Sequence, residues 1–357
     1  IFSIAWPIML GSLGQNLIYL VDTSFIGRIG EIELGASAIG GIYYFLLFNI
    51  GYAMNIGMQV MVARRKGEGK QATIGEVLDH QLRLIVLLGA AEFILMQYLS
   101  GGILAAIIDS KEVLEKTNTF LHYRSYGILF GLLNSCFMSF FIGIGNTRVT
   151  VWTTGVMVTM NILFLYCLVF GNWGFPAMGI GGAGLASAIA EATVTLVFIL
   201  FFIVKKFRKD YHLFQFAKVK FNLIISMLNL STPLIFQQII SVGSWWLFFI
   251  SIEHLGEHSL AISNLVRSIY TFYGIPVWAL ASTVNAMTSN LIGQGRHADV
   301  IPLIRRVANI SIGFAALFSF FINFFPALML SVYTNDQVLI LDSIPTLRTL
   351  TLAIVLF

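Results

Sequence analysis

Long apolar runs separated by short polar breaks dominate this chain. About ten of these runs have roughly the 20 or more residues that a helix needs to cross the hydrocarbon core of a bilayer. We expect membrane-spanning helices near 3–26, 35–62, 76–105, 118–143, 149–171, 181–204, 223–252, 261–289, 300–331 and 338–357. The breaks carry Gly, Asn and charge, as in Gly67-Glu68-Gly69-Lys70. The pattern predicts an all-α polytopic membrane protein.

The first part of the sequence is repeated loosely in the second. Residues 7–70 align without a gap with residues 233–296, at a constant offset of 226. Pro7 aligns with Pro233, and the break at Gly67 aligns with the break at Gly293. A weak echo of 122–124 at 346–348 makes the last span the partner of the fourth. Six spans per half is an even number, so we expect a parallel repeat about an axis along the membrane normal.

The repeat predicts the domain organisation. We expect a six-helix bundle over residues 1–206, a cytoplasmic linker over 207–222, and a second bundle over 223–357 that holds about four spans. At the same offset, a complete second copy would extend about 75 residues beyond residue 357, enough for two spans. We therefore expect the sequence to be part of a twelve-span protein.

Composition and charge support a membrane setting. The chain is 57% hydrophobic and 11% charged, whereas a soluble protein carries roughly 25% charged residues. Cys136 and Cys167 lie in apolar runs and fit no disulfide or zinc pattern. The net charge of +4 is not a sign of nucleic-acid binding, because the basic residues are topological signals.

The placement of Lys and Arg predicts the orientation, because cytoplasmic loops are enriched in both. The intervening loops hold only Arg28, Lys111 and Lys116. Alternate loops hold the rest of the loop residues: Arg64, Arg65, Lys66, Lys70, Arg148, Lys205, Lys206, Arg208, Lys209, Lys218, Lys220, Arg296, Arg305 and Arg306. We expect a multi-pass protein of the plasma (inner) membrane with a cytoplasmic N-terminus.

Asp22 is an ionisable residue inside the first predicted span. Ser12, Gln15, Tyr19 and Asp22 follow spacings of 3, 4 and 3 residues, which place them on one helical face. An ionisable residue is costly in lipid and therefore marks a functional site. Burial favours the neutral acid and a bound cation favours the carboxylate, so Asp22 can exchange a proton for Na⁺ or a cationic substrate. The alternative is an Asp near the helix end that reaches the outer interface.

The matching face of the second half differs in chemistry. It consists of Gln238, Ser241, Trp245 and Phe248 and carries no charge. The two halves are therefore expected to share a scaffold but not an ion site.

Other polar residues lie within the predicted spans. Asn161 is either an interhelical hydrogen bonder or a cavity ligand, because a buried Asn needs partners. Glu191 follows a run of small residues that lets helices approach closely, and we favour a structural pairing with Arg124 over a place in the cavity. Weaker candidates, typical of packing hydrogen bonds, are Arg267, Gln59 and Asn285.

Several stretches resemble the MATE (multidrug and toxic compound extrusion) family. The segments 4–11 and 21–30 are similar to the opening of a MATE transporter. The segments 143–148, 174–187 and 290–296 are similar to signatures that follow the family's fourth, fifth and eighth spans. Together these stretches extend the resemblance over essentially the whole chain.

The resemblance implies twelve helices in two bundles around a V-shaped cavity, and export of organic cations driven by inward Na⁺ or H⁺ flow. It places Asp22 at the family's acidic first-span position, Asn161 at a fifth-span Asn, and Ser187 at a sixth-span Thr or Ser. Two positions depart from members of the family: Leu165 replaces an Asp, and Ser241 stands where NorM-type members carry a Glu. The tenth-span acidic position falls at or beyond residue 357. Asp22 remains the principal carboxylate.

The sequence thus predicts a secondary antiporter that exports amphipathic organic cations or drugs. The expected ion and substrate site comprises Asp22, Gln15, Tyr19, Asn161 and Ser187, with Na⁺ held at Asp22 and Asn161 if Na⁺ is the coupling ion. We expect no other cofactor, no nucleic-acid partner and a monomer in the lipid bilayer.

Three alternative functions have sequence requirements or signatures of their own. A lipid-linked oligosaccharide flippase of the same superfamily would need several intramembrane cations, and only Arg124 and Arg267 qualify, with Arg83 near a loop. An inactive paralogue is suggested by Leu165 and Ser241. An enzyme is not expected, because no His-Glu-x-x-His motif or Ser/His dyad is present.

Overall fold

A computed structural model describes residues 1–205, 207–216, 218–253, 256–334 and 336–356. All regular structure in these ranges is helical. The first half holds α1 (Phe2–Gly27), α2 (Glu31–Gly67), α3 (Gln71–Ile94), the π-helix η1 (Leu95–Leu99), α4 (Ser100–Ala105), α5 (Lys111–Gly143), α6 (Arg148–Phe170), the 3₁₀ turn η2 (Asn172–Gly174) and α7 (Gly179–Val204). The remainder holds α8 (Phe207–Asp210), α9 (Phe221–Glu253), α10 (Glu257–Gly293), η3 (His297–Asp299), α11 (Val300–Phe324), α12 (Pro326–Ser331) and α13 (Gln337–Leu356).

The helices confirm the all-α membrane fold. In the described ranges, 8 helical stretches are long and apolar enough to cross a membrane. The spans expected at 261–289 and 338–357 are also helical, as α10 and α13, apart from Phe357, which lies outside the described residues.

One span that was expected to be a single helix is broken in the structure. The sequence predicted a single helix over 300–331, but the structure ends α11 at Phe324 and begins α12 at Pro326. Phe325 between them has φ −130° and ψ 44°. Proline disfavours the helical conformation of the residue before it, which explains the break.

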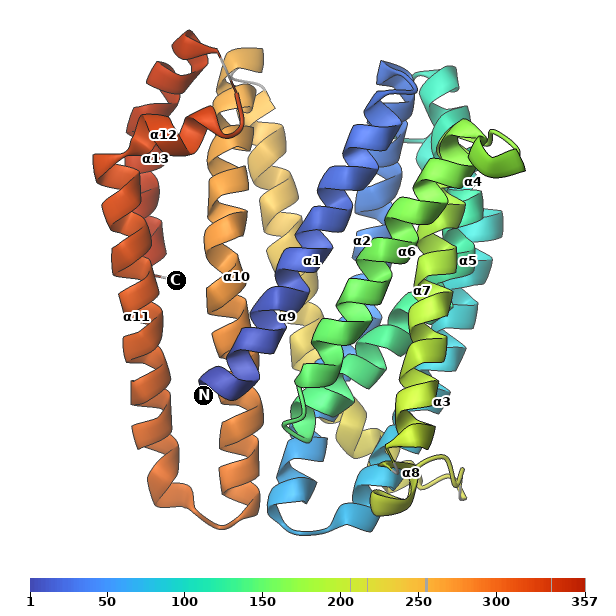
Figure 1. Ribbon diagram of the computed structural model, residues 1–357, viewed down its shortest axis with the longest axis vertical. Helices are drawn as coiled ribbons and strands as arrows, with labels where there is room; N and C mark the ends of the chain where they lie inside the picture. Colours follow the sequence, from blue (N-terminus) through green and yellow to red (C-terminus); the bar gives the residue numbers. More distant parts are fainter. Residues whose placement is uncertain (206, 217, 254–255, 335, 357) are drawn as a thin grey trace.

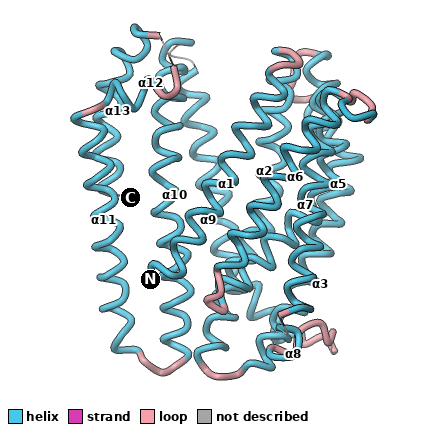
Figure 2. The backbone as a smooth tube through the Cα atoms, in the orientation of Figure 1, coloured by secondary structure: helices cyan, strands magenta, loops and turns pink. Residues whose placement is uncertain are grey.

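The helices form two groups (Figures 1 and 2). Helices α1 to α7 pack together, most extensively α5 against α7 and against α2, and α6 against α7. Helix α10 packs against α11 and α13 in the second group. Across the divide, α1 contacts α10, and α9 contacts α2. Because α9 is the repeat partner of α1, and α10 of α2, these two contacts are equivalent.

The two groups meet most closely at the end that carries the repeated glycine breaks. A Cβ atom at Gly67 would lie 2.1 Å from the carbonyl oxygen of Asn290, and a Cβ at Gly293 would lie 2.1 Å from that of Arg64. Gly67 and Gly293 are repeat partners, as are Arg64 and Asn290. The contact is therefore reciprocal, as a two-fold axis between parallel repeats requires.

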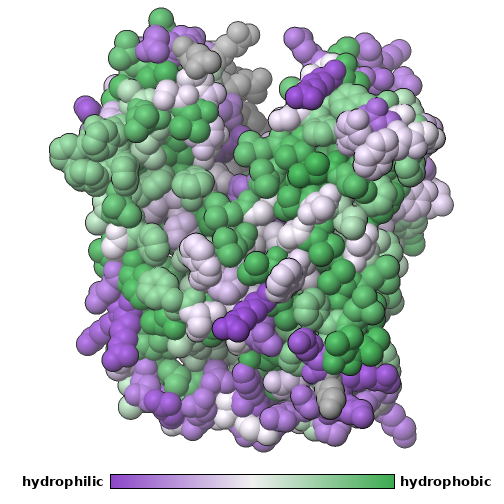
Figure 3. All heavy atoms as spheres, in the orientation of Figure 1, coloured by the Kyte–Doolittle hydropathy of each residue, from purple (hydrophilic) through white to green (hydrophobic). Residues whose placement is uncertain are grey.

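The opposite end of the molecule is open. Figure 3 shows a notch between the two groups at the top of the view, whereas the bottom, where the glycine breaks lie, is closed. A hydrophobic belt covers much of the middle of this face, and hydrophilic residues gather at the bottom. This distribution is that of a protein embedded in a bilayer.

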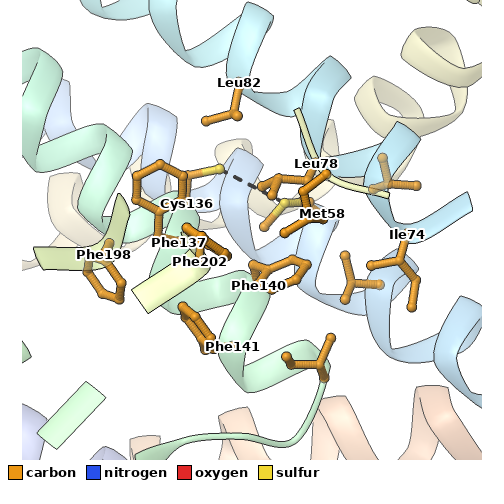
Figure 4. Close-up of a cluster of buried hydrophobic side chains, with 14 of the residues drawn as sticks. Met58, Ile74, Leu78, Leu82, Cys136, Phe137, Phe140, Phe141, Phe198 and Phe202 are labelled. Atoms are coloured by element: carbon orange, nitrogen blue, oxygen red, sulfur yellow. Dashed lines mark hydrogen bonds between the residues drawn. The ribbon is translucent and has the colours of Figure 1, made fainter. Parts of the chain in front are cut away.

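The core of the first bundle is aromatic near the closed end. Phe137, Phe140, Phe141, Phe198 and Phe202 are all nearly or fully buried and pack around the Cys136 thiol and Met58 (Figure 4). Both cysteines are free and buried, as the sequence suggested.

The segment that follows α7 is held on the first bundle. The Asp79 carboxylate accepts hydrogen bonds from the backbone N–H groups of Phe214 (2.9 Å) and Phe216 (2.8 Å). His80 Nε2 accepts a hydrogen bond from the Lys220 N–H at 2.9 Å. Leu213 is buried in the aromatic core. Much of the expected linker is therefore ordered against α3.

Candidate ion-binding site

Asp22 lies near the far end of α1, on the side that faces α6 and α7. Its Oδ1 atom is buried, and none of the described residues donates a hydrogen bond to it. Asn161 of α6 and Ser187 of α7 lie beside the carboxyl group. Asp22 therefore points into the first bundle, and the alternative of a side chain that merely reaches the outer interface is not supported.

The two polar neighbours of Asp22 are joined to each other. The Asn161 amide donates a hydrogen bond to the Ser187 hydroxyl at 3.2 Å. Asn161 Oδ1 is then buried without a partner among the described residues. Asn161 is thus an interhelical hydrogen bonder whose amide oxygen lies near Asp22, and its role as a cavity ligand stays a prediction. The arrangement offers carboxylate, amide and hydroxyl oxygens, which suit a hard monovalent cation or a proton.

An ion pair lies next to this group. Arg124 of α5 donates two hydrogen bonds to the Glu191 carboxylate of α7, at 2.8 and 2.6 Å. The Tyr44 hydroxyl of α2 donates to the same carboxylate at 3.3 Å. The Arg124 guanidinium also lies over the Tyr44 ring, 3.8 Å from its centroid. The structure therefore confirms the pairing of Glu191 with Arg124.

Two glycines of α5 make room for this pair. A Cβ at Gly127 would lie 2.4 Å from Arg124 Nη1 and from Glu191 Oε2. A Cβ at Gly131 would lie 3.0 Å from the Tyr44 hydroxyl. The absence of side chains at these positions lets α5 and α7 pack closely around buried charge.

The balance of charge decides what the site can do. Arg124 is close enough to Asp22 to attract it electrostatically, but both of its Nη atoms are bonded to Glu191. A buried carboxylate in a low-dielectric interior is unfavourable unless a proton or a cation neutralises it. Binding of either one at Asp22 stays a prediction.

Gln15 and Tyr19 are not brought into this cluster. Both are exposed, Tyr19 to 66%, and no described residue receives a side-chain hydrogen bond from them. The face of α1 that meets α6 contains Gly14, whose Cβ position lies 2.3 Å from Thr154 Cγ2. The place of Gln15 and Tyr19 in a binding site stays a prediction.

Tyr44 is the neighbour that the sequence reasoning missed. Its repeat partner at the offset of 226 is Tyr270, also a tyrosine. A tyrosine kept at the same position of both repeats, within a membrane span, could have pointed to Tyr44 as a functional residue.

The second bundle has a groove in place of this cluster. Its volume is about 500 Å³, and hydroxyl and aromatic side chains line most of it, including Ser241, Trp245 and Phe248. Arg267 is the one charged residue among the described lining side chains, and its guanidinium lies 4.6 Å from the centroid of the Phe249 ring. The groove holds no carboxylate from the described residues.

Known proteins match this chain along both halves. The sequence model of the MatE family matches residues 7–167 and 233–357, and the two matches begin 226 residues apart, as the repeat does. A probable multidrug resistance protein NorM of Photorhabdus laumondii is 24% identical over 93% of the chain and 73% of its own length. The Bacillus subtilis protein YoeA, also described as a probable multidrug resistance protein, is 22% identical over 84% of the chain and 65% of its length.

Solved structures share the fold. The outward-facing conformation of a multidrug resistance MATE family transporter of the MOP superfamily superimposes with a TM-score of 0.89 and 19% identity, over 99% of the chain and 78% of that protein. A MOP superfamily transporter from Pyrococcus furiosus superimposes with a TM-score of 0.88. The chain belongs to the MATE family of multidrug resistance transporters.

Proposed function

We propose that this chain belongs to a secondary antiporter that exports amphipathic organic cations in exchange for Na⁺ or H⁺. The observation that carries the proposal is the pair of buried oxygens without partners, Asp22 Oδ1 and Asn161 Oδ1, beside an Arg124 that is already bound to Glu191. The multidrug resistance descriptions of the relatives support export of small molecules.

Exchange follows from competition for one negative charge. When the open end faces outward, Na⁺ or H⁺ reaches Asp22 and neutralises it. Neutralisation removes the attraction that holds a cationic substrate in the cavity, and the substrate leaves. Rocking of the two bundles, with separation of the reciprocal glycine contact at the closed end, would then expose the site to the other side. There the substrate binds again and displaces the coupling ion, because both compete for the Asp22 carboxylate.

The basic loops support the orientation. The closed end carries Arg64, Arg65 and Lys70, and enrichment in Lys and Arg is typical of cytoplasmic loops. We therefore place the closed end and the N-terminus in the cytoplasm of a cell with the protein in its plasma (inner) membrane. We also propose that the transporter works as a monomer, because each half brings its own contact to the axis between them.

The flippase alternative is weakened by the ion pair. A pyrophosphate-bearing substrate requires cations that are not neutralised in the cavity, and the guanidinium of Arg124 is committed to Glu191.

The test is Asp22→Asn in full-chain protein, reconstituted in vesicles and assayed for efflux of a cationic dye. Separate Na⁺ and pH gradients of equal driving force identify the coupling ion. We expect the variant to lose gradient-driven efflux, while Asp109→Asn, at an exposed position after α4, keeps it. Wild-type efflux from a well-incorporated Asp22→Asn protein would overturn the assignment.

A further inference from the structure

Glu92 is a second buried carboxyl group of the first bundle. It lies in the last turn of α3, and its residue is only 4% exposed. Both carboxyl oxygens are buried, and neither has a hydrogen-bond partner among the described residues. Buried acids in proteins are almost always paired or hydrogen-bonded. A carboxyl group with no partner at either oxygen therefore needs an explanation.

Helix α3, which contains Glu92, packs on α5 and α2. Gly89, one turn before Glu92, would place a Cβ 2.9 Å from Leu129 Cδ1 of α5. Met96, one turn after it, belongs to a buried apolar cluster with Phe120, Ile128 and Tyr44. Glu92 thus lies between two turns that pack on apolar side chains.

The helix changes its geometry directly after Glu92. The π-helix η1 begins at Leu95, and π-helical turns inside α-helices occur frequently at functional sites. The distortion gives a second, independent sign that this part of α3 has a role beyond packing.

The charges near Glu92 do not neutralise it. The Tyr44 hydroxyl, which feels the charge of Glu92, donates to Glu191. The only described cation of this cluster, Arg124, is bound bidentately to Glu191. Apart from the charged ends of α2 and α5, the other ionisable side chains of these two helices are Tyr43, Tyr52, His122, Tyr123, Tyr126 and Cys136. Helix α9, which also touches α3, carries no ionisable residue before Glu253.

We propose that Glu92 is a second protonation site of the first bundle, which holds a proton in the conformation described here. A proton, and not Na⁺, is the ligand because the neighbouring side chains are apolar and do not offer the several oxygens that a metal cation needs. Asp22, by contrast, has amide and hydroxyl oxygens beside it. The two acids flank the same Arg124–Glu191–Tyr44 cluster, one toward α6 and one toward α3.

The site couples protonation to the packing of α3. A neutral Glu92 fits the apolar contact with α5, whereas an ionised Glu92 requires water or a new partner. Rising pH therefore opposes this packing, and falling pH supports it. In a transport cycle, loss of the proton from Glu92 would accompany movement of α3 away from α5. This last step rests on the proposed antiport function, whereas the protonated state of Glu92 does not.

The decisive experiment reads protonation directly. Infrared spectra of the purified full chain at neutral pH should contain the carbonyl band of a buried protonated carboxyl group that is lost in Glu92→Gln. Glu112→Gln, at an exposed position at the start of α5, should leave that band unchanged. Gln is the isosteric mimic of the neutral acid, so we expect Glu92→Gln to fold with the wild-type melting temperature.

A second measurement keeps the proposal testable if bands overlap. The melting temperature of the wild type should fall more steeply on raising the pH above neutral than that of Glu92→Gln. An unchanged band in Glu92→Gln together with identical pH profiles would show that Glu92 is ionised and would overturn the proposal. Wild-type efflux from Asp22→Asn, together with a carboxyl band that is lost in Glu92→Gln, would overturn the antiport proposal and leave the protonation of Glu92 standing, so the two proposals fail separately.

Discussion

The two bundles use one backbone plan for different purposes. In the first, acid and base are buried together between α1, α2, α5, α6 and α7, and Arg124 and Glu191 lie at the centre. In the second, α9, α10 and α13, the repeat partners of α1, α2 and α5, line a groove of hydroxyl and aromatic side chains with Arg267 at its wall. Asp22 of the first has Phe248 as its repeat partner. The difference teaches that duplication conserves how helices pack, while the chemistry diverges at a few inward positions.

Moving the carboxylate between the bundles is the severest test of this difference. We expect the double variant Asp22→Asn, Phe248→Asp to show no gradient-driven dye efflux, because the side chains around Phe248 are the aromatic Trp245 and Phe249 and not an Asn–Ser pair. Efflux from reconstituted protein is the measurement. Recovery of transport relative to Asp22→Asn alone would show that the two bundles are chemically interchangeable.

Removing one member of the buried pair should destabilise the protein strongly. Arg124→Met leaves Glu191 buried without its cation, and breaking such a pair costs about 3–5 kcal/mol. We expect a large fall in the melting temperature in detergent. The double variant Arg124→Met, Glu191→Met should recover much of the loss, since no uncompensated charge remains.

Arg267→Met is the matched control in the second bundle. Arg267 is exposed and contacts Phe249 through a cation–π interaction, which contributes about 0.5–1 kcal/mol at exposed sites. A destabilisation as large as that of Arg124→Met would contradict the contrast between the bundles.

The reciprocal glycine contact should respond equally from both sides. A methyl group at Gly293 or at Gly67 would collide with a backbone carbonyl of the other half, and such overpacking costs about 1–3 kcal/mol. We expect Gly293→Ala and Gly67→Ala each to separate the closed ends. Distances between spin labels on α2 and α10 would measure the change.

Gly313→Ala provides the baseline for that experiment, because the new methyl group has no atom of another helix within 4 Å. Unequal effects of the two contact variants would show that the halves are not symmetric at their axis.

The smallest expected effect concerns the loops beside these glycines. The Lys70 ammonium and the Arg65 guanidinium, which bond to Glu68, lower the pKa of its carboxyl group from 4.5 to about 2. Because the folded form has the lower pKa, the stabilisation is present at neutral pH and is lost as the pH falls from 4.5 toward about 2. The repeat partner of Glu68 is Gln294, which does not titrate.

Glu68→Gln makes the first loop resemble the second. We expect a small loss of thermal stability at neutral pH that shrinks as the pH is lowered through this window, with Gln294→Ala showing no such trend. A pH-independent difference between Glu68→Gln and the wild type would contradict the assignment.

Much of the fold could be predicted from the sequence because bilayer helices have a length and a composition set by the solvent. The offset between Pro7 and Pro233 also located both halves, and the two family matches begin at these residues. The break at Phe325 was missed, because the apolar run continues across it and only Pro326 signals the interruption.

The site was less predictable because helical periodicity gives a direction around one helix and not the neighbour in that direction. Gln15 shares a face with Asp22, yet α6 covers this helix at Gly14 and leaves Gln15 exposed. Tyr44 and Glu191 are 147 residues apart in sequence, and no pattern within either span indicates that they meet. Pairing of Glu191 with Arg124 was predictable because few intramembrane partners of opposite charge exist in this chain.

The contact of Gly67 with Asn290 and of Gly293 with Arg64 has a genetic consequence. A self-complementary interface of this kind is the one that two identical subunits form about a two-fold axis. In such a homodimer, a single codon change at the glycine would alter both contacts at once. In the present chain each glycine has its own codon, so one contact can drift while the other still holds the closed end together. The two glycine contacts can therefore come to differ in strength, and the closed end would then open first at the weaker contact.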